Sequence, residues 1–302
     1  MLYLIDASVY VFRAYYSMPP DMLDREGNAV HALFGFARFL GDLIERAKPR
    51  YLAVAFDESL ETSFRNRIDP TYKANREPAP ADLKLQFGRC REFCEHLGVA
   101  HFGSGEYEAD DIIGTLHARF RREGLPATLV TRDKDLAQLV REGDVYWNYT
   151  ENLRLQHHEI EGHFGVAPER YADYLALTGD AVDNIKGVPG VGPKTAAVLL
   201  KEFASLEELY DNLEEVARLP IRGAAKLPQR LETHKDQAFL ARRLTEIARD
   251  MPLAAERDSL RPRKPDLTSL EAFFDRHNFG PMLRRQSLRL AELAASMERP
   301  AA

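Results

Sequence analysis

The chain has 302 residues, of which 41 are Lys or Arg and 47 are Asp or Glu, so its formal net charge is −6. Hydrophobic residues make up 45% and charged residues 29%, which excludes intrinsically disordered, collagen-like and low-complexity chains. The acidic balance argues against a generic nucleic-acid-binding protein, because such proteins usually carry an excess of positive charge for phosphates.

Short apolar runs that end in a polar or charged residue recur through the first half of the chain. They are Leu2–Ile5, Leu52–Phe56, Val99–Phe102, Ala127–Thr131 and Asp144–Trp147. Helical patterns such as Ala32–Glu45 and Asp110–Glu123 lie between most of them. Strands that alternate with helices predict an α/β fold with a parallel sheet that is buried on both faces. In such sheets, functional sites lie outside the carboxyl ends of the strands.

The interval from residue 58 to about residue 88 interrupts this alternation. Pro70, Pro78 and Pro80 break any long helix, no clean strand is visible, and basic residues are frequent. A long irregular segment within a compact domain is usually a functional lid or disordered. After Asp180 the pattern changes to a Gly/Pro-rich hairpin followed by helices, which predicts a smaller helical module over about 180–250.

Cellular location and redox state also leave traces in the sequence. Two cysteines are too few for a disulfide scaffold, and no further Cys completes a zinc set with Cys90 and Cys94, so we expect two half-buried thiols. No apolar run approaches the roughly 20 residues of a membrane span, and the chain opens on a predicted strand without a charged leader. These features predict a cytoplasmic protein without a membrane partner.

Aspartates stand at the carboxyl ends of three predicted strands. Asp6 and Asp57 end their strands, and Asp133 follows Thr131 by two residues. Each could be a helix N-cap, the commonest structural role of Asp at a strand-to-helix turn, and this alternative is strongest for Asp133 and Asp135. Because the carboxyl ends of parallel strands meet at one edge of the sheet, these acids are also expected to lie close together.

Two more acidic groups strengthen the case for a metal site. Residues 106–111 hold four acids in six positions, including Glu106, and these acids repel one another unless a cation neutralises them, although one or two at a helix start need no metal. Asp180 and Asp183 add a pair three residues apart. Oxygen ligands without His or Cys favour Mg²⁺ or Mn²⁺. Their number favours two ions, an arrangement commonly used for displacement at phosphorus.

The glycine-rich stretch over 184–195 is the third informative feature. It differs from a P-loop, because Pro193 separates Gly192 from Lys194, whereas a P-loop needs Gly directly before Lys. Pro193 suits the first position of a helix, and the glycines allow backbone amides to face an anion at that helix N-terminus. We interpret the stretch as a helix–hairpin–helix that grips a nucleic-acid backbone without reading bases; a purely structural turn is the alternative.

Several ordered motifs resemble the flap endonuclease family, in particular the 5′-nuclease domain at the front of bacterial DNA polymerase I. They are Asp6, Phe12–Tyr15, Phe56–Asp57, Phe64–Arg65, Tyr72–Arg76, Glu108–Asp111, Asp133–Asp135, Gly179–Thr195 and the closing Phe273–Leu283 stretch. The resemblance runs from Met1 to about Arg285. It implies a PIN-like nuclease domain over 1–179 with a helical arch at about 58–88. A helix-hairpin-helix (H3TH) module would follow over 180–250. The last segment, over 251–302, would pack back on the nuclease domain and end in a peripheral tail.

The resemblance also implies roles for individual residues. The first metal ion would be held by Asp6, Asp57, Glu108, Asp110 and Asp111, and the second by Asp133, Asp135, Asp180 and Asp183. Lys73 and Arg76 would reach the scissile phosphate, and Tyr72 would stack on a base. Arg13 and Arg65 would contact phosphates, with a salt bridge that braces the fold as the alternative. Gly187, Gly190, Gly192, Lys194 and Thr195 would bind downstream duplex together with a K⁺ ion.

The implied function is a stand-alone, structure-specific 5′ nuclease, both flap endonuclease and 5′-3′ exonuclease, for DNA replication and repair. It would hydrolyse phosphodiesters near single-strand/duplex junctions by two-metal-ion catalysis and leave a 5′-phosphate. The expected partners are branched or flapped DNA, RNA-primed DNA included, and no obligate protein partner is evident. One alternative is a catalytically weak DNA-structure-binding protein of the same fold. A small-molecule phosphatase that uses Asp133 and Asp135 leaves the glycine hairpin unexplained.

The net charge has to be reconsidered once the proposed metal ligands are counted separately from the other acids. Without the nine proposed ligands, 38 acids remain against 41 bases, so the rest of the chain carries +3. The acidic excess is therefore concentrated where cations are expected. Binding to DNA should depend on divalent metal as well as on salt.

Overall fold

The computed structural model describes residues 1–58 and 62–298, so residues 59–61 of the predicted arch and residues 299–302 of the predicted tail lie outside the described residues. Six strands form one sheet in the order β3-β2-β1-β4-β5-β6. They are β1 (Leu2–Asp6), β2 (Tyr51–Asp57), β3 (Ala100–Ser104), β4 (Ala127–Val130), β5 (Val145–Asn148) and β6 (Leu153–Gln156). All neighbouring pairs are parallel except β5 and β6, which are antiparallel. The predicted α/β fold with a mostly parallel sheet is confirmed.

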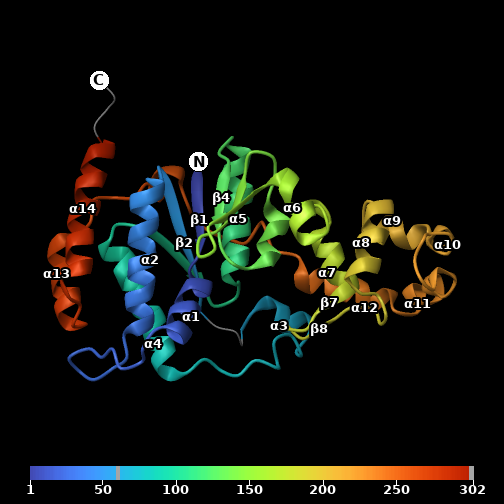
Figure 1. Ribbon diagram of the computed structural model, residues 1–302, viewed down its shortest axis with the longest axis horizontal. Coiled ribbons are helices and arrows are strands. Elements are labelled where there is room, and N and C mark those ends of the chain that lie inside the picture. The colour runs from blue at the N-terminus through green and yellow to red at the C-terminus, as the bar shows by residue number, and fades with distance from the viewer. Residues whose placement is uncertain (59–61, 299–302) are drawn as a thin grey trace.

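Helices cover both faces of this sheet, which explains why its central strands are continuous apolar runs (Figure 1). One face packs on α1 (Ala7–Ser17), α2 (His31–Ala47) and α4 (Ala81–His96), in a core that includes Phe36, Phe56 and Trp147. The other face packs on α5 (Ala109–Arg122), around Leu4 and Leu129. Cys90 and Cys94 on α4 are fully buried and not half-buried as expected, because they belong to the first core.

A third core lies beyond the sheet and holds a helical module. Its helices are α7 (Tyr171–Thr178), α8 (Pro193–Glu202), α9 (Leu206–Asp211), α10 (Leu213–Val216), α11 (Leu227–Thr233) and α12 (Lys235–Thr245). The shorter elements α6 (His157–Phe164), η1 (Lys134–Leu139), η2 (Pro168–Arg170), η3 (Ala224–Lys226) and η4 (Arg257–Leu260) complete the connections. Tyr171 and Leu175 of α7 belong to this core, so α7 packs with the helical module although the sequence-based division places it with the nuclease domain.

The end of the chain returns to the sheet. Helices α13 (Leu267–Arg276) and α14 (Pro281–Glu298) contribute Phe273, Phe274 and Leu283 to the first core. They lie at the end of the molecule opposite to α8–α11 (Figure 1). Among residues 1–58 and 62–298, no helix is long and apolar enough to cross a membrane.

The predicted arch contains less helix at its centre than the resemblance implies, and more helix at its end than the sequence pattern predicts. Helix α3 (Phe64–Ile68) is short, Asp69–Pro80 forms turns without a helix, and α4 begins at Ala81 directly after Pro80. Proline removes a helical donor and disfavours helix in the residue before it, which explains the irregular stretch. Residues 81–88, which the sequence suggested to be irregular, are the first two turns of α4.

Candidate metal centre and nucleic-acid interface

One pocket of about 400 Å³ collects most of the predicted ligands at the carboxyl edge of the sheet. Eight of the nine predicted acids line it: Asp6, Asp57, Glu108, Asp110, Asp133, Asp135, Asp180 and Asp183. They come from the ends of β1 and β2, the turn after β4, the start of η1, the start of α5, and the β7–β8 pair (Gly179–Asp180 and Ile185–Lys186) with the turn between its strands. We call this cavity the acidic pocket. Its position at the carboxyl ends of parallel strands agrees with the rule for α/β sheets.

Hydrogen bonds fix several of these acids relative to one another. The Thr131 hydroxyl donates to Asp6 Oδ2 over 2.9 Å and accepts from the Asp133 N–H, also over 2.9 Å. Asp57 Oδ1 accepts from the Ala109 N–H over 2.8 Å, which ties the end of β2 to the start of α5. Neighbouring strands and the first turn of α5 are thereby joined through the acids themselves.

The acidic pocket is lined by more acidic side chains than basic ones, so its negative charge is only partly neutralised by the protein. Burial, with Asp57 and Asp133 nearby, raises the pKa of Asp6 to about 8. Burial likewise raises the pKa values of Asp57, Asp110, Asp133 and Asp135, and neighbouring carboxylates raise them further. Two buried carboxylate oxygens, Glu108 Oε1 and Asp135 Oδ1, have no hydrogen-bond partner within the described part of the chain. Unpartnered buried oxygens in an oxygen-only donor set fit hard divalent cations.

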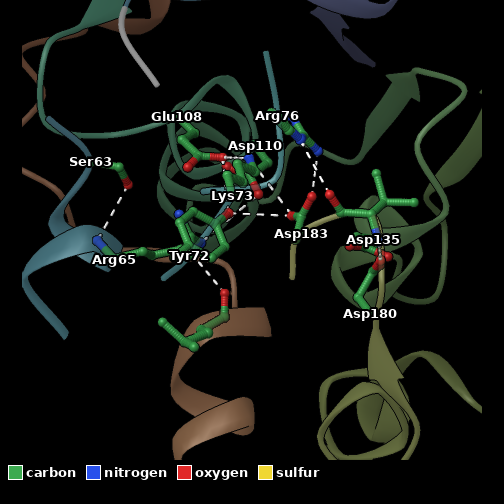
Figure 2. A network of polar contacts seen from close by, with 12 residues as sticks. Ser63, Arg65, Tyr72, Lys73, Arg76, Glu108, Asp110, Asp135, Asp180 and Asp183 are labelled. Atoms are coloured by element: carbon green, nitrogen blue, oxygen red, sulfur yellow. Dashed lines mark hydrogen bonds and ion pairs between the residues drawn. The ribbon is translucent and has the colours of Figure 1, made fainter. Parts of the chain in front are cut away.

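Basic side chains of the protein lie among these acids (Figure 2). Lys73 Nζ is paired with Glu108 and lies 3.7 Å from Asp183 Oδ2, and Arg76 is paired with Asp183. Lys134 Nζ lies 3.5 Å from Asp180 Oδ2. No three acids, His or Cys of residues 1–58 and 62–298 already converge as a preformed metal site. The composition of the pocket thus suits a divalent ion, while several of its acids are held by ammonium and guanidinium groups.

Lys73 is placed by its backbone as well as by its charge. Its φ angle is +55°, in the left-handed region, and its N–H donates to the Asp183 carbonyl over 2.9 Å. Left-handed backbone is uncommon for a residue with a side chain and is stabilised here by that bond. The bond ties the segment between α3 and α4 to the β7–β8 turn across the acidic pocket.

Asp111 and Arg65 lie outside the acidic pocket and contact each other. Arg65 donates from Nη1 and Nη2 to the two Asp111 oxygens over 2.7 and 2.8 Å, and Asp111 also accepts from the N–H groups of Glu108 and Ala248. Arg65 is 1% exposed and Asp111 is 0% exposed. Because both groups are enclosed and satisfied, the geometry contradicts a metal role for Asp111 and a DNA contact for Arg65. It favours the salt-bridge alternative for Arg65.

Tyr72, Arg13 and Glu106, which the sequence analysis also named, lie in three different environments. Tyr72 is 4% exposed in the third core, with its hydroxyl 3.3 Å from Glu108 Oε2, so its ring has no free face for a base. Arg13 is exposed on α1 and lines a separate groove with Arg38. Glu106 pairs with Arg67 and does not line the acidic pocket.

The glycine hairpin divides into packed and exposed positions. A side chain at Gly187 would meet the backbone of Thr178 and Gly179, so this position requires glycine for close packing. Gly190 has φ +77° and is exposed, and Gly192 is the exposed residue before α8. Lys194 is exposed in the first turn of α8, with Thr195 half-buried beside it. Exposed glycines and an exposed lysine therefore lie where the sequence predicted an anion site.

Sequence reasoning missed the residues that position the acids. Thr131 bridges Asp6 and Asp133, the Ser8 hydroxyl accepts from the Asp57 N–H over 3.2 Å, and Lys134 approaches Asp180. Thr131 and Ser8 each lie two residues from a predicted ligand, which is a weak signal by itself. The sequence does not show which ligand each hydroxyl contacts, because that depends on how neighbouring strands are aligned in the sheet.

Comparison with known proteins places the chain in a family. Residues 1–165 match the family model described as 5′-3′ exonuclease, N-terminal resolvase-like domain, and residues 166–268 match 5′-3′ exonuclease, C-terminal SAM fold. A 5′-3′ exonuclease of Aquifex aeolicus is 34% identical over 270 residues, which are 89% of each chain. DNA polymerase I of Pseudomonas aeruginosa is 40% identical over 274 residues, or 90% of this chain and 30% of the polymerase. The chain spans about a third of the length of the polymerases that it matches.

Solved structures share the fold at lower sequence identity. The T5 D15 protein co-crystallized with metal ions has a TM-score of 0.66 at 19% identity, covering 97% of this chain and 99% of that one. The bacteriophage T5 D15 flap endonuclease in a pseudo-enzyme-product complex with DNA and metal ions has a TM-score of 0.62, at the same identity and coverage. On the two family models and the Aquifex aeolicus relative, the chain belongs to the 5′-3′ exonuclease family.

Proposed function

We propose that this chain is a divalent-metal-dependent 5′ nuclease that hydrolyses DNA phosphodiesters near junctions between single strand and duplex. The observation that carries the proposal is the acidic pocket, in which eight carboxylates face one cavity and two of their buried oxygens have no partner within the described residues. Membership in the 5′-3′ exonuclease family supports the same chemistry.

The acids of the pocket would hold two hard divalent ions, Mg²⁺ or Mn²⁺. Asp6, Asp57, Glu108 and Asp110 would hold one ion, and Asp133, Asp135, Asp180 and Asp183 the other. Bound ions supply positive charge that lowers the pKa of water and stabilises the leaving oxygen. The two T5 D15 structures share the fold of this chain and contain metal ions, which supports metal binding but not the role of each residue.

Lys73 and Arg76 would orient the scissile phosphate. Both now pair with acids of the pocket, Lys73 with Glu108 and Arg76 with Asp183. A phosphate brings acceptor oxygens that compete for the same donors, and the guanidinium of Arg76 can grip two of them at once. Transfer of these donors from carboxylate to phosphate would free the acids for the ions.

A second pocket, of about 460 Å³, adjoins the acidic pocket and would give the 5′ strand a route. The two pockets share Phe12, Asp57, Lys73 and Arg76. Phe12, Pro78, Ala79 and Phe87 form its apolar lining, and Lys84 and Arg91 add basic groups. Apolar faces beside basic groups suit an unpaired strand, whose bases stack and whose phosphates are negative. We call this cavity the strand pocket.

The exposed rim of the glycine hairpin would contact the duplex. Gly190, Gly192 and Lys194 offer backbone amides and an ammonium group at the start of α8, which suits a phosphate. A K⁺ ion at this hairpin remains a prediction from the resemblance. Duplex affinity measured in K⁺ and in Na⁺ at equal ionic strength tests it.

One cleavage experiment separates this proposal from a catalytically weak DNA-structure-binding protein. A 5′-flap substrate labelled on the flap strand is incubated with the protein in Mg²⁺, in Ca²⁺ and in EDTA. We expect incision near the junction in Mg²⁺ with a 5′-phosphate on the product, and binding without cleavage in Ca²⁺. Junction binding without incision in Mg²⁺ or Mn²⁺ would establish the alternative instead.

A further inference from the structure

Residues Leu244–Ala248, which we call the strap, link the helical module to the rest of the chain. The strap consists of the last two residues of α12, the last helix of the module, and of the three residues after it, and it leads into the segment that returns to the sheet (Figure 1). Five consecutive residues of this connection have a backbone group bonded to a side chain from elsewhere. Such complete engagement is unusual for the end of a helix and the connection after it, because terminal helix carbonyls have no partner within the helix and most loop backbone is exposed to solvent.

Three side chains make these bonds. Arg65 donates from Nε to the Leu244 carbonyl over 2.9 Å and from Nη2 to the Glu246 carbonyl over 3.1 Å. Gln138 donates to the Thr245 carbonyl over 2.9 Å and accepts from the Ile247 N–H over 3.0 Å. Asp111 Oδ1 accepts from the Ala248 N–H over 2.8 Å. We call these three residues the anchors of the strap.

The anchors are enclosed, and two of them, Arg65 and Asp111, are bound to each other as well as to the strap. Gln138 is 1% exposed, as buried as the Arg65–Asp111 pair. A buried ion pair held by two parallel hydrogen bonds has a fixed geometry, and loss of one partner leaves an uncompensated charge. On α5, a side chain at Gly114 would lie 2.6 Å from the Ala248 carbonyl oxygen, so the helix and the strap approach each other closely.

Each anchor lies on, or shortly before, a part of the chain that carries residues of the acidic pocket. Arg65 is on α3, which leads into the segment with Lys73 and Arg76. Asp111 follows Asp110 directly and accepts from the Glu108 N–H over 3.1 Å. Gln138 belongs to η1, the element that begins with Lys134 and Asp135. The strap is therefore bonded to α5 and η1, which carry acids of the pocket, and to α3, which precedes Lys73 and Arg76.

We infer that Arg65, Asp111 and Gln138 are positioning residues that couple the helical module to the acidic pocket through the strap. The inference rests on the proposed function, in which the module binds duplex and the pocket cleaves the strand. Because the anchors bind strap backbone and not DNA or metal, they set where the pocket lies relative to duplex held by the module. Displacement of reacting groups by about 1 Å can cost a hundredfold in rate, so such a fixed connection matters for cleavage.

Gln138→Leu is the variant that tests the inference most directly. Gln138 is neutral, so its replacement removes two hydrogen bonds to the strap without leaving a buried charge. Gln86 is the matched control, because it is 0% exposed and accepts from the N–H groups of Ala32 and Leu33 over 2.8 and 3.2 Å at the start of α2. Gln86→Leu changes the same volume and also leaves two backbone groups unpaired, but it does not touch the strap.

The readouts are the single-turnover cleavage rate at saturating protein, the Mg²⁺ concentration that gives half the maximal rate, flap-DNA affinity in Ca²⁺, and thermal stability. We expect both variants to lower the melting temperature. Only Gln138→Leu should lower the saturated rate, by about tenfold or more, and raise the Mg²⁺ requirement, with affinity in Ca²⁺ unchanged. Arg65→Lys, which keeps the charge but loses the fork that reaches two carbonyls, should change the rate in the same direction.

Equal saturated rates for the Gln138→Leu and Gln86→Leu proteins would show that the anchors serve stability alone and overturn the inference. A fall in affinity that matches the fall in rate would also overturn it, because binding and not alignment would then be lost. If Gln138→Leu does not fold, Gln138→Glu, which keeps the acceptor for Ile247, takes its place in the same assays. An inactive unmodified protein would instead refute the proposed function.

Discussion

Buried carboxylates at the two edges of the sheet have opposite surroundings. Asp144, beside the amino end of β5, accepts from His117, Arg121 and the N–H groups of Ala127 and Arg141 over 2.8–3.0 Å. Burial opposes its ionisation, but these donors outweigh burial and hold the pKa of Asp144 below its usual range. At the carboxyl edge, burial and neighbouring acids raise the pKa of Asp6 to about 8.

The difference shows that burial alone does not mark an acid as a metal ligand. An acid whose oxygens are all met by donors of the protein has a structural role, and Asp111 belongs with Asp144 in this class. An acid that lies near other acids and has too few donors needs a cation from outside. The number of donors per buried oxygen therefore separates the two classes, and it can be tested by substitution.

The largest difference should appear when one acid of each class loses its charge. We expect Asp6→Asn to lower the Mg²⁺-dependent cleavage rate by about a thousandfold, because a ligand of a divalent ion becomes neutral. Asp144→Asn should leave the rate of the folded protein within about threefold, since it lies at the other edge of the sheet. Single-turnover cleavage of a 5′-flap substrate measures both. Comparable losses in the two variants would contradict the division into classes.

Lys73 provides the next largest effect, because it is the cation that the protein itself places among the ligands. We expect Lys73→Ala to slow cleavage by about a hundredfold with little change in flap-DNA affinity in Ca²⁺. Lys48 is a matched control, because it is also a lysine in left-handed backbone, with φ +46° against +55°. Lys48→Ala repeats the change of backbone strain outside the pocket. A parallel loss of affinity in Lys73→Ala would make Lys73 a phosphate anchor and not a catalytic contact.

The sequence predicts part of this division and not the rest. Asp6 and Asp57 end strands whose alternation with helices is visible, so their shared edge follows from topology. Asp110 and Asp111 are adjacent in one motif, and successive helical residues point about 100° apart, so only one of them can face the pocket. Which one depends on the packing of α5 against the strap, which no local pattern encodes. The role of Gln138 is hidden for the same reason, because its partners lie 107 and 109 positions away in the chain.

The strand pocket is expected to give a smaller effect. Gly88 lines it, and a side chain there would have open space around its Cβ. Gly88→Leu fills the route while favouring helix α4, so we expect about a tenfold slower incision of a flap without loss of stability. Gly162 on α6 is also a helical glycine with open space and serves as the control. Equal rates of flap incision for Gly88→Leu and Gly162→Leu would show that the 5′ DNA strand does not pass through the strand pocket.

The smallest expected effect concerns stability without metal, and here the two edges should respond with opposite sign. Asp144→Asn should destabilise the protein by about 1–3 kcal/mol at neutral pH, because donors lose a charged acceptor. Asp6→Asn should stabilise the protein in EDTA at pH 8, because it removes a charge that burial and its neighbours disfavour. Urea unfolding in EDTA measures both changes.

The pH dependence of these changes follows from the direction of each shift. The folded state binds a proton at Asp6 more tightly than the unfolded state does, so the Asp6 carboxyl makes stability fall as pH rises from about 4 to about 8. The pKa of Asp144 is lowered on folding, so its contribution is present above the usual range of a carboxyl and is lost as pH falls below it. Mg²⁺ binds the ionised acids and should therefore raise the melting temperature more at pH 8 than at pH 5, and less in Asp6→Asn than in the unmodified protein. If added Mg²⁺ stabilises the two proteins equally at pH 8, Asp6 does not contribute to the metal site.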